Sequence, residues 1–218
     1  MGIFDKIVNS VVNNIKSSVN GKVNQMANQA ANSVSNAVSQ GMEALLSKSI
    51  KKETVTFKAL PKNADELKAD PNFDLKDPEK VVALTVAAFC AYGENKSATH
   101  AMLNVLKGPS PLSNLELSFI NDRFMDDQTY KPFSYFAGAT VENDYTPSEP
   151  YKISVYTLEH SKDQESEGYL TLFVQSSGAD SPREVVLRKK ASTGEWFLWT
   201  FEGILLDIRK PQSQNPWA

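Results

Sequence analysis

The sequence predicts an α+β protein: a long N-terminal amphipathic helix, then a domain with about three helices packed on an antiparallel meander of five to six strands. Three observations support this. Apolar residues recur every three to four positions over residues 1–50, the period of a helix. Helix-start and helix-stop residues bracket three segments between 77 and 124. Strand-like segments joined by short turns then occupy residues 153–209.

Residues 1–52 have the pattern of a helical arm. Twelve apolar positions follow one another at a mean spacing of about 3.7 residues, nearer an 11-residue repeat than the spacing of about 3.5 of a left-handed coiled coil. Gly21 and Gly41 are the weak points of this helix. The predicted interaction face of the arm consists of Phe4, Val8, Val11, Ile15, Val19, Val23, Met26, Ala30, Val34, Val38, Met42 and Leu45.

The polar face of the arm is mainly Asn, Ser and Gln with few charges, so its helix needs a cover over the apolar face. Three covers stay open: a second copy or partner helix, a membrane surface, or the body of the protein. Such weakly charged amphipathic helices suit membrane surfaces, and the rhythm of Val, Ala and Ser resembles lipid-surface helices of the synuclein and perilipin kind. The predicted function is non-enzymatic self-association or peripheral membrane attachment through the arm. The alternative is a small-molecule or peptide-binding module whose arm packs on its own body.

Composition narrows the class of protein. The longest apolar run, residues 81–90, is too short to span a bilayer, and the first residues lack the apolar core of a signal peptide. Cys90 is the single cysteine, so no internal disulfide forms, and we expect a cytoplasmic protein, peripheral to the membrane if the arm binds lipid. Residues 1–52 carry a net charge of +4 and the remainder −7, which argues against nucleic acid as the partner of the body.

The body domain, residues 53–212, begins with an alternating segment at 54–58 that is typical of a short strand. Residues 60–75 contain two prolines and predict a loop with at most one short turn of helix. Asp77, Pro78 and Glu79 then supply a helix cap, a proline at the first helical position and an early acid. The first body helix is expected over residues 78–92.

Two more helices follow in the body. Ser97 begins one that runs to Lys107 and ends at a Gly-Pro pair, and Ser113 caps another that runs to residue 124. The inward residues of this last helix are expected to be Leu115, Phe119, Ile120 and Phe124.

Strands dominate the rest of the body. Their connections at 178–182 and 192–194 are rich in turn residues, and short connections require antiparallel neighbours. Trp196 and Trp199 have opposite parity in one strand, so one is expected in the core and the other on the exposed face. Residues 213–218 are expected to form a flexible tail. The predicted strands are 153–158, 169–175, 184–189, 195–201 and 204–209.

Three segments of the body resemble a known family. Residues 136–151, the aromatic segment 196–199 and the closing segment 205–211 together resemble an uncharacterised bacterial α+β domain family of unknown function. The resemblance covers about residues 55–211 and leaves out the arm. It implies an α+β fold and carries no activity and no catalytic residues.

The sequence contains no recognisable enzyme site. Both glycine-rich phosphate signatures are absent, and Cys90, His100 and His160 lack the spacing of metal ligands. The carboxylates at 142–149 are too sparse for a calcium loop. We therefore predict no catalytic, cofactor-binding or metal-binding residues.

An aromatic group in the body allows two interpretations. The rings are either a binding surface, since rigid Tyr-rich loops make good contact surfaces, or they close the open end of the sheet, which we favour. The group consists of Tyr130, Phe133, Tyr135, Phe136, Tyr145 and Tyr151.

Overall fold

The structure, a computed structural model, describes residues 40–41, 44 and 46–217. The chain divides into two units, Met1–Ala44 and Leu45–Ala218, and the fold is that of the second. All twelve residues of the predicted arm face lie outside the described residues, so the arm helix and its face stay predictions. Among the helices in the described part of the chain, none is long and apolar enough to cross a membrane.

The predicted α+β class is confirmed for the body. Helices come first and most strands follow, with one strand ahead of the helices. The strands and α-helices are β1 (Lys51–Phe57), α2 (Ala64–Ala69), α3 (Pro78–Cys90), α4 (Lys96–Lys107), α5 (Asn114–Arg123), β2 (Tyr151–Thr157), β3 (Tyr169–Val174), β4 (Arg183–Lys190) and β5 (Glu195–Thr200). The 3-10 helices are η1 (Gln128–Tyr135), η2 (Glu159–Lys162), η3 (Glu165–Glu167), η4 (Glu202–Leu205) and η5 (Gln212–Gln214).

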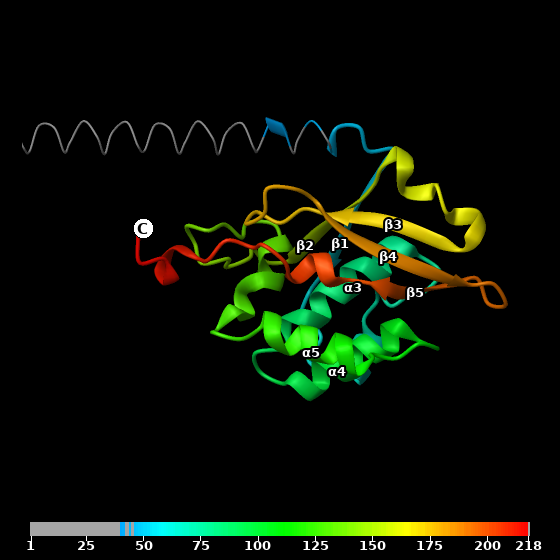
Figure 1. Cartoon of the computed structure of the whole chain (residues 1–218), viewed down its shortest axis with the longest axis horizontal. Helices are drawn as coiled ribbons and strands as arrows, with labels where there is room; N and C mark the ends of the chain where they lie inside the picture. The colour runs from blue at the N-terminus through cyan, green and yellow to red at the C-terminus, as the bar shows by residue number, and fades with distance from the viewer. Residues whose placement is uncertain (1–39, 42–43, 45, 218) are drawn as a thin grey trace, which may run out of the picture. The chain divides into compact units, whose positions relative to one another are not determined.

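The five strands form one antiparallel sheet in the order β1-β2-β3-β4-β5 (Figure 1). Although all the α-helices of the body separate β1 from β2 in sequence, the two pair from Lys51 opposite Thr157 to Phe57 opposite Tyr151. β1 begins two residues before the predicted start of the body at 53. The remaining strands follow one another as an antiparallel meander, as predicted. The β2–β3 connection contains η2 and η3, whereas a short turn joins β4 to β5.

The helices cover one face of this sheet (Figure 1). α3 packs against β1, β2 and β5 and is buried along nearly its whole length, which explains its continuous apolar sequence. α4 packs on both α3 and β5. This packing places the end of α4 beside the last strand of the sheet.

Local chemistry sets the helix starts close to where the sequence predicts them. Asp77 caps α3, and Pro78 is its first residue. α4 starts one residue earlier than predicted because Asn95 supplies its cap. Ser113 caps α5 and forms a reciprocal capping box with Glu116. These caps satisfy backbone donors that a helix start leaves without partners.

The predicted inward face of α5 is only partly correct. Ile120 and Phe124 are buried and Phe119 is half-buried, but Leu115 is 81% exposed. The buried face runs instead through Glu116, which pairs with a lysine of α4, and continues at the next two positions four residues apart. Leu115 lies about 100° around the helix from Glu116 and therefore points to solvent.

The predicted sixth strand, residues 204–209, is wrong. η4 forms at its start, and this segment joins no sheet in the described part of the chain. Its backbone is held by side chains instead: the Tyr135 hydroxyl donates to the Ile204 carbonyl and the Tyr145 hydroxyl to the Arg209 carbonyl, each at 2.8 Å. The segment is therefore fastened to the body by side-chain hydrogen bonds and by one backbone bond, from the Arg209 N–H to the Gly178 carbonyl at 2.9 Å, rather than by strand pairing.

Candidate binding site at the β4–β5 hairpin

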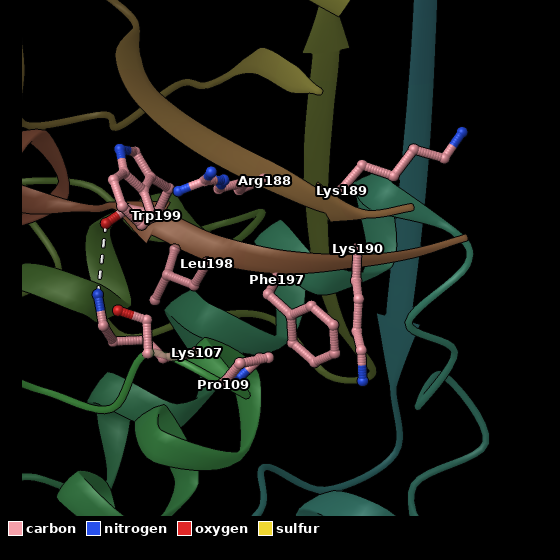
Figure 2. Close-up of a pocket in the computed structure, with 9 residues that line it drawn as sticks. Lys107, Pro109, Arg188, Lys189, Lys190, Phe197, Leu198 and Trp199 are labelled. Carbon is pink, nitrogen blue, oxygen red and sulfur yellow. Dashed lines mark hydrogen bonds between the residues drawn. The ribbon is translucent and has the colours of Figure 1, made fainter. Parts of the chain in front are cut away.

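A cavity of about 190 Å³ lies where the β4–β5 hairpin meets the end of α4 (Figure 2). Because α4 packs on β5, the turn that follows this helix reaches the hairpin. The walls combine basic side chains with aromatic rings. This β5 cavity is lined by Lys107, Pro109, Ser110, Arg188, Lys189, Lys190, Phe197, Leu198 and Trp199.

The alternation of the two strands decides which side chains share a face. Arg188 lies opposite Phe197 in the register, so both project from the face opposite to that of buried Leu198. Lys189 and Lys190 point in opposite directions; Lys190 lies on the same side of β5 as Phe197, whereas the guanidinium of Arg188 lies beside Trp199 (Figure 2). Arg188 and Lys190 therefore line different parts of the cavity wall.

The guanidinium of Arg188 lies against two aromatic rings. Its central carbon lies 5.2 Å from the ring centroid of Tyr169 on β3 and 4.9 Å from that of Trp199 on β5. The two rings meet edge to face with centroids 5.9 Å apart. Within the described residues, no carboxylate pairs with this guanidinium and no acceptor takes a hydrogen bond from it. Arg188 is thus oriented while its N–H donors are free to meet a ligand.

Lys107 lines the same cavity but has an acidic partner. Its ammonium lies 2.7 Å from a Glu116 oxygen, and its side chain is 4% exposed. Burial by itself raises the pKa of Glu116, but the hydrogen bonds from Lys107 and Ser113 outweigh it and hold this pKa below its usual range. The pair joins α4 to α5, and its positive charge is already balanced.

The outer edge of β5 is covered by other parts of the chain. The Trp196 backbone N–H donates to the Leu75 carbonyl at 2.6 Å. The Lys107 ammonium donates to the Trp199 carbonyl at 3.4 Å, the bond drawn in Figure 2. At the opposite edge of the sheet, the Asn72 side-chain amide donates to the carbonyl of Thr56 on β1 at 3.0 Å. Each edge strand thus has backbone groups engaged by its own domain.

The apolar wall of the cavity depends on close approach at Gly108. This residue ends α4 with a φ of +56°, and a Cβ atom there would overlap the ring of Phe197. Glycine accepts both the left-handed backbone and the close contact. Phe197 is consequently packed against the helix end and half-buried, with Pro109 beside it in the cavity wall.

This arrangement suits an anion that carries an apolar part. Arg188 and Lys190 supply positive charges that no carboxylate of the described chain neutralises. Phe197 and Pro109 supply apolar surface in the same cavity. Guanidinium groups recognise carboxylate and phosphate oxygens through paired hydrogen bonds. The site is locally basic on a body whose net charge over residues 53–218 is −7.

Four of the six aromatic residues of the predicted body surface are buried. Tyr130 and Tyr145 stack on each other with ring centroids 5.6 Å apart. Tyr135 and Phe136 are also buried and line a depression of about 330 Å³ beside β2. These rings therefore lie mainly inside the domain.

The other two, Phe133 and Tyr151, line a second depression of about 370 Å³ together with Cys90. The Tyr151 hydroxyl donates to Glu149 at 3.3 Å. Burial raises the pKa of the Cys90 thiol, which keeps it protonated at neutral pH. This depression joins two of the predicted aromatic residues, but we find in it no oriented, unpartnered charge comparable to that of Arg188.

The two histidines lie apart from the β5 cavity. His100 is half-buried on α4, and both burial and the nearby charge of Lys96 lower its pKa. His160 is exposed in η2, where its ring meets Phe173 edge-on at 5.4 Å. Neither residue lines the cavity.

Three carboxylates come close enough to hold a metal ion. Oxygens of Glu53, Asp77 and Glu79 lie within 4.8 Å of one another. The Lys51 ammonium, however, lies 2.8 Å from both Glu53 and Glu79. Burial lowers the pKa of Lys51, but its hydrogen bonds to these two glutamates outweigh the burial and raise it well above the ordinary value. The cluster is an ion-pair network that fastens β1 to α3.

Sequence reasoning identified part of this site. Trp196 is buried and Trp199 is half-buried on the other face, as the parity of the strand predicts. Arg188 was missed, because its setting depends on Tyr169 and Trp199 from two neighbouring strands. One signal was available: Arg188 and Lys190 alternate along a predicted strand that immediately precedes the tryptophan strand.

Comparison with known proteins gives one match, and it lies in the body. A family model described as "Domain of unknown function (DUF6935)" matches residues 59–212, which includes the β5 cavity and leaves out the N-terminal arm. The match confirms the resemblance to an uncharacterised domain family. No curated protein and no solved structure matches the chain.

Proposed function

The chain belongs to the DUF6935 family of unknown function, and we propose that it is a non-enzymatic binding protein whose body captures an oxyanion-bearing ligand in the β5 cavity. One observation carries the proposal. The Arg188 guanidinium is oriented by two rings and has no acceptor within the described protein. An oriented donor loses less entropy when it binds, so a carboxylate or phosphate in its plane completes the site at low cost.

The N-terminal arm supplies the second part of the proposed function. It attaches the body to a second copy, to a partner helix or to a membrane surface, and the proposed location is the cytoplasm. The support is the apolar stripe of residues 1–52 and its weakly charged polar face. The arm carries a net charge of +4, which argues against its occupying the basic β5 cavity.

Thermal unfolding of the full chain tests the body. Acetate or phosphate is compared with chloride at one ionic strength, because a ligand that binds the native state raises the melting temperature. At ten times the Kd the expected rise is about 3–6 °C for a chain of this size. Arg188→Gln should remove the rise. Lys62→Gln, at an exposed lysine outside the cavity, should keep it. An equal rise in melting temperature in both variants would show that the rise is a general effect of the salt, and it would refute the proposal.

Vesicle flotation and light scattering test the arm. The full chain is expected to float with vesicles or to form a higher-mass species. Val19→Asp places a charge in the middle of the predicted stripe and should abolish whichever behaviour the wild type has. Asn20→Asp adds the same charge on the polar face and should preserve it. If Val19→Asp behaved as the wild type, the arm would have no role in attachment.

A further inference from the structure

We propose that the body has a second ligand site, on the face of the sheet opposite α3, for a hydroxylated ligand of monosaccharide size that carries one acidic group. The site is the depression of about 330 Å³ beside β2, called here the β2 depression. It shares no lining residue with the β5 cavity, so this inference goes beyond the proposed function and does not rest on it. It follows from the parting of two strands, from the hydroxyl groups that line the depression and from one lysine without a carboxylate partner.

The depression lies where β2 and β3 part. The two strands pair at only two positions of each strand. Residues 136–137 lie beside the first half of β2 instead, and the Ala137 N–H donates to the Lys152 carbonyl at 2.8 Å. Just beyond β3, the Ser177 N–H donates to the Ser134 carbonyl at 3.0 Å. The β2 depression is thus formed where a segment of the chain is inserted between two parting strands.

Several hydroxyl groups line the depression from one face of the sheet. Thr54 lies opposite Ser154 in the register of β1 and β2, and both alternate with the buried Val55 and Val155. The Oγ atoms of Thr54 and Ser154 share a hydrogen bond of 3.2 Å. Tyr156 lines the same depression, and no group of the described chain pairs with its hydroxyl. Since hydroxyls both donate and accept hydrogen bonds, this wall matches the hydroxyls of a ligand.

Lys152 gives the depression its charge. Lys152, Ser154 and Tyr156 alternate along β2 and therefore lie on one face. Lys152 is exposed, and no carboxylate in the described part of the chain pairs with it. The half-buried Gln175 adds an amide donor and acceptor to the same wall. An ammonium is a point charge with three rotatable donors, so it fits one acidic group, a carboxylate or a phosphate.

The volume of the depression sets the size of the ligand. A cavity of about 150 Å³ is sufficient for benzene, a six-membered ring without substituents. The β2 depression is about 330 Å³ and therefore has room for a six-membered sugar ring with its hydroxyls and an acidic substituent. Tyr135 and Phe136 also line it but are buried, so they offer little surface on which an aromatic ligand could stack. Polar contacts therefore decide which ligand binds.

Isothermal titration calorimetry of the full chain tests this inference. The Arg188→Gln variant is used, so that binding of oxyanions in the β5 cavity does not contribute. Glucuronate and glucose 6-phosphate are compared with glucose, which lacks the charge, and with acetate, which lacks the hydroxyls. The better of the two sugar anions should bind about tenfold tighter than glucose and acetate. If glucose or acetate bound as tightly, or if neither sugar anion bound, the inference would be wrong.

Three further substitutions place the binding. Lys152→Gln should weaken the better sugar anion about tenfold and leave glucose unchanged. Tyr156→Phe removes a hydroxyl but keeps the ring, and it should weaken both sugar anions and glucose about threefold. Lys76→Gln, at an exposed lysine outside the depression, should have no effect. If Lys152→Gln bound the sugar anions as the Lys76→Gln control does, the β2 depression would not be the site. The proposal for Arg188 would still stand, because its test concerns a different cavity.

Discussion

Lys107 and Arg188 line the same cavity in opposite ways. Lys107 is almost completely buried and lies 2.7 Å from its own carboxylate, Glu116. Arg188 is exposed, contacts two neighbouring aromatic rings and has no anion among the described residues. A buried charge left unpaired destabilises a protein strongly, whereas an exposed one stays hydrated. The comparison shows that a positive charge in this cavity can stabilise the fold, as at Lys107, or remain available to a ligand, as at Arg188.

Removing the buried cation should give the largest effect. Lys107→Met leaves the Glu116 carboxylate without its partner, and we expect the free energy of unfolding to fall by about 3 kcal/mol. The estimate is at the lower end for buried pairs because Glu116 is 18% exposed. Denaturant titration measures the change as a lower midpoint. Lys62→Met, at a solvent-exposed ion pair, should change stability by less than about 0.5 kcal/mol. Equal losses in the two variants would show that the buried ion pair stabilises the fold no more than the exposed one.

The contact between the helix end and the aromatic wall comes next. Gly108→Ala combines a positive φ with overlap onto Phe197, so we expect a loss of about 2–3 kcal/mol. Gly194 also has a positive φ, +75°, but open space where a Cβ would lie. Gly194→Ala should therefore cost only about 1 kcal/mol. Thermal denaturation of both variants measures the cost of the overlap with Phe197. No difference between them would mean that the Phe197 ring moves aside without loss of stability.

Acid should remove part of what Lys107 contributes. The folded state lowers the pKa of Glu116, so its carboxylate stabilises the fold above the unfolded value of 4.5. This contribution is lost as the pH falls through the lower folded pKa. The advantage of the wild type over Glu116→Gln should thus be constant near neutral pH and shrink below about pH 4.5. Denaturant titrations at several pH values measure it. An advantage that did not shrink at any acid pH at which the chain stays folded would show that the pair is not ionic.

The smallest effect on stability should come from the exposed cation. Arg188→Lys keeps the charge but loses the planar guanidinium and part of the contact with both rings. The free energy of unfolding should therefore fall by about 1 kcal/mol or less. The rise in melting temperature with acetate or phosphate should nevertheless fall sharply. Parallel melting curves with and without the anion measure both quantities. A large loss of stability without any ligand would place Arg188 in the same structural class as Lys107.

The features that the sequence predicted well depend on neighbouring residues. Asp77 and Pro78 start α3, and Ser113 caps α5, because a cap needs a side chain only two or three positions from the backbone groups it satisfies. The parity of Trp196 and Trp199 followed from the geometry of one strand. Such signals act within a single element and can be read from sequence alone.

The features that the sequence missed depend on residues far apart in the chain. Leu115 was expected inside, but the pairing of Glu116 with a lysine of α4 decides which face of α5 is buried. Residues 204–209 have the composition of a strand. The hydroxyl of Tyr135, 69 positions earlier in the chain, nevertheless donates a hydrogen bond to the carbonyl of Ile204. Arg188 gains its setting from three strands at once. Composition does not reveal contacts between residues that are far apart in the sequence.

The covered edges of the sheet have a consequence for how copies of this protein can meet. A bare edge strand is a template on which another chain can extend the sheet, and it promotes fibre formation. Here Leu75 and Lys107 engage backbone groups of β5, and Asn72 engages one of β1. The body therefore resists edge-to-edge pairing of its sheet with that of another copy. Copies of the body can therefore lie close together at high concentration without their sheets joining into fibrils.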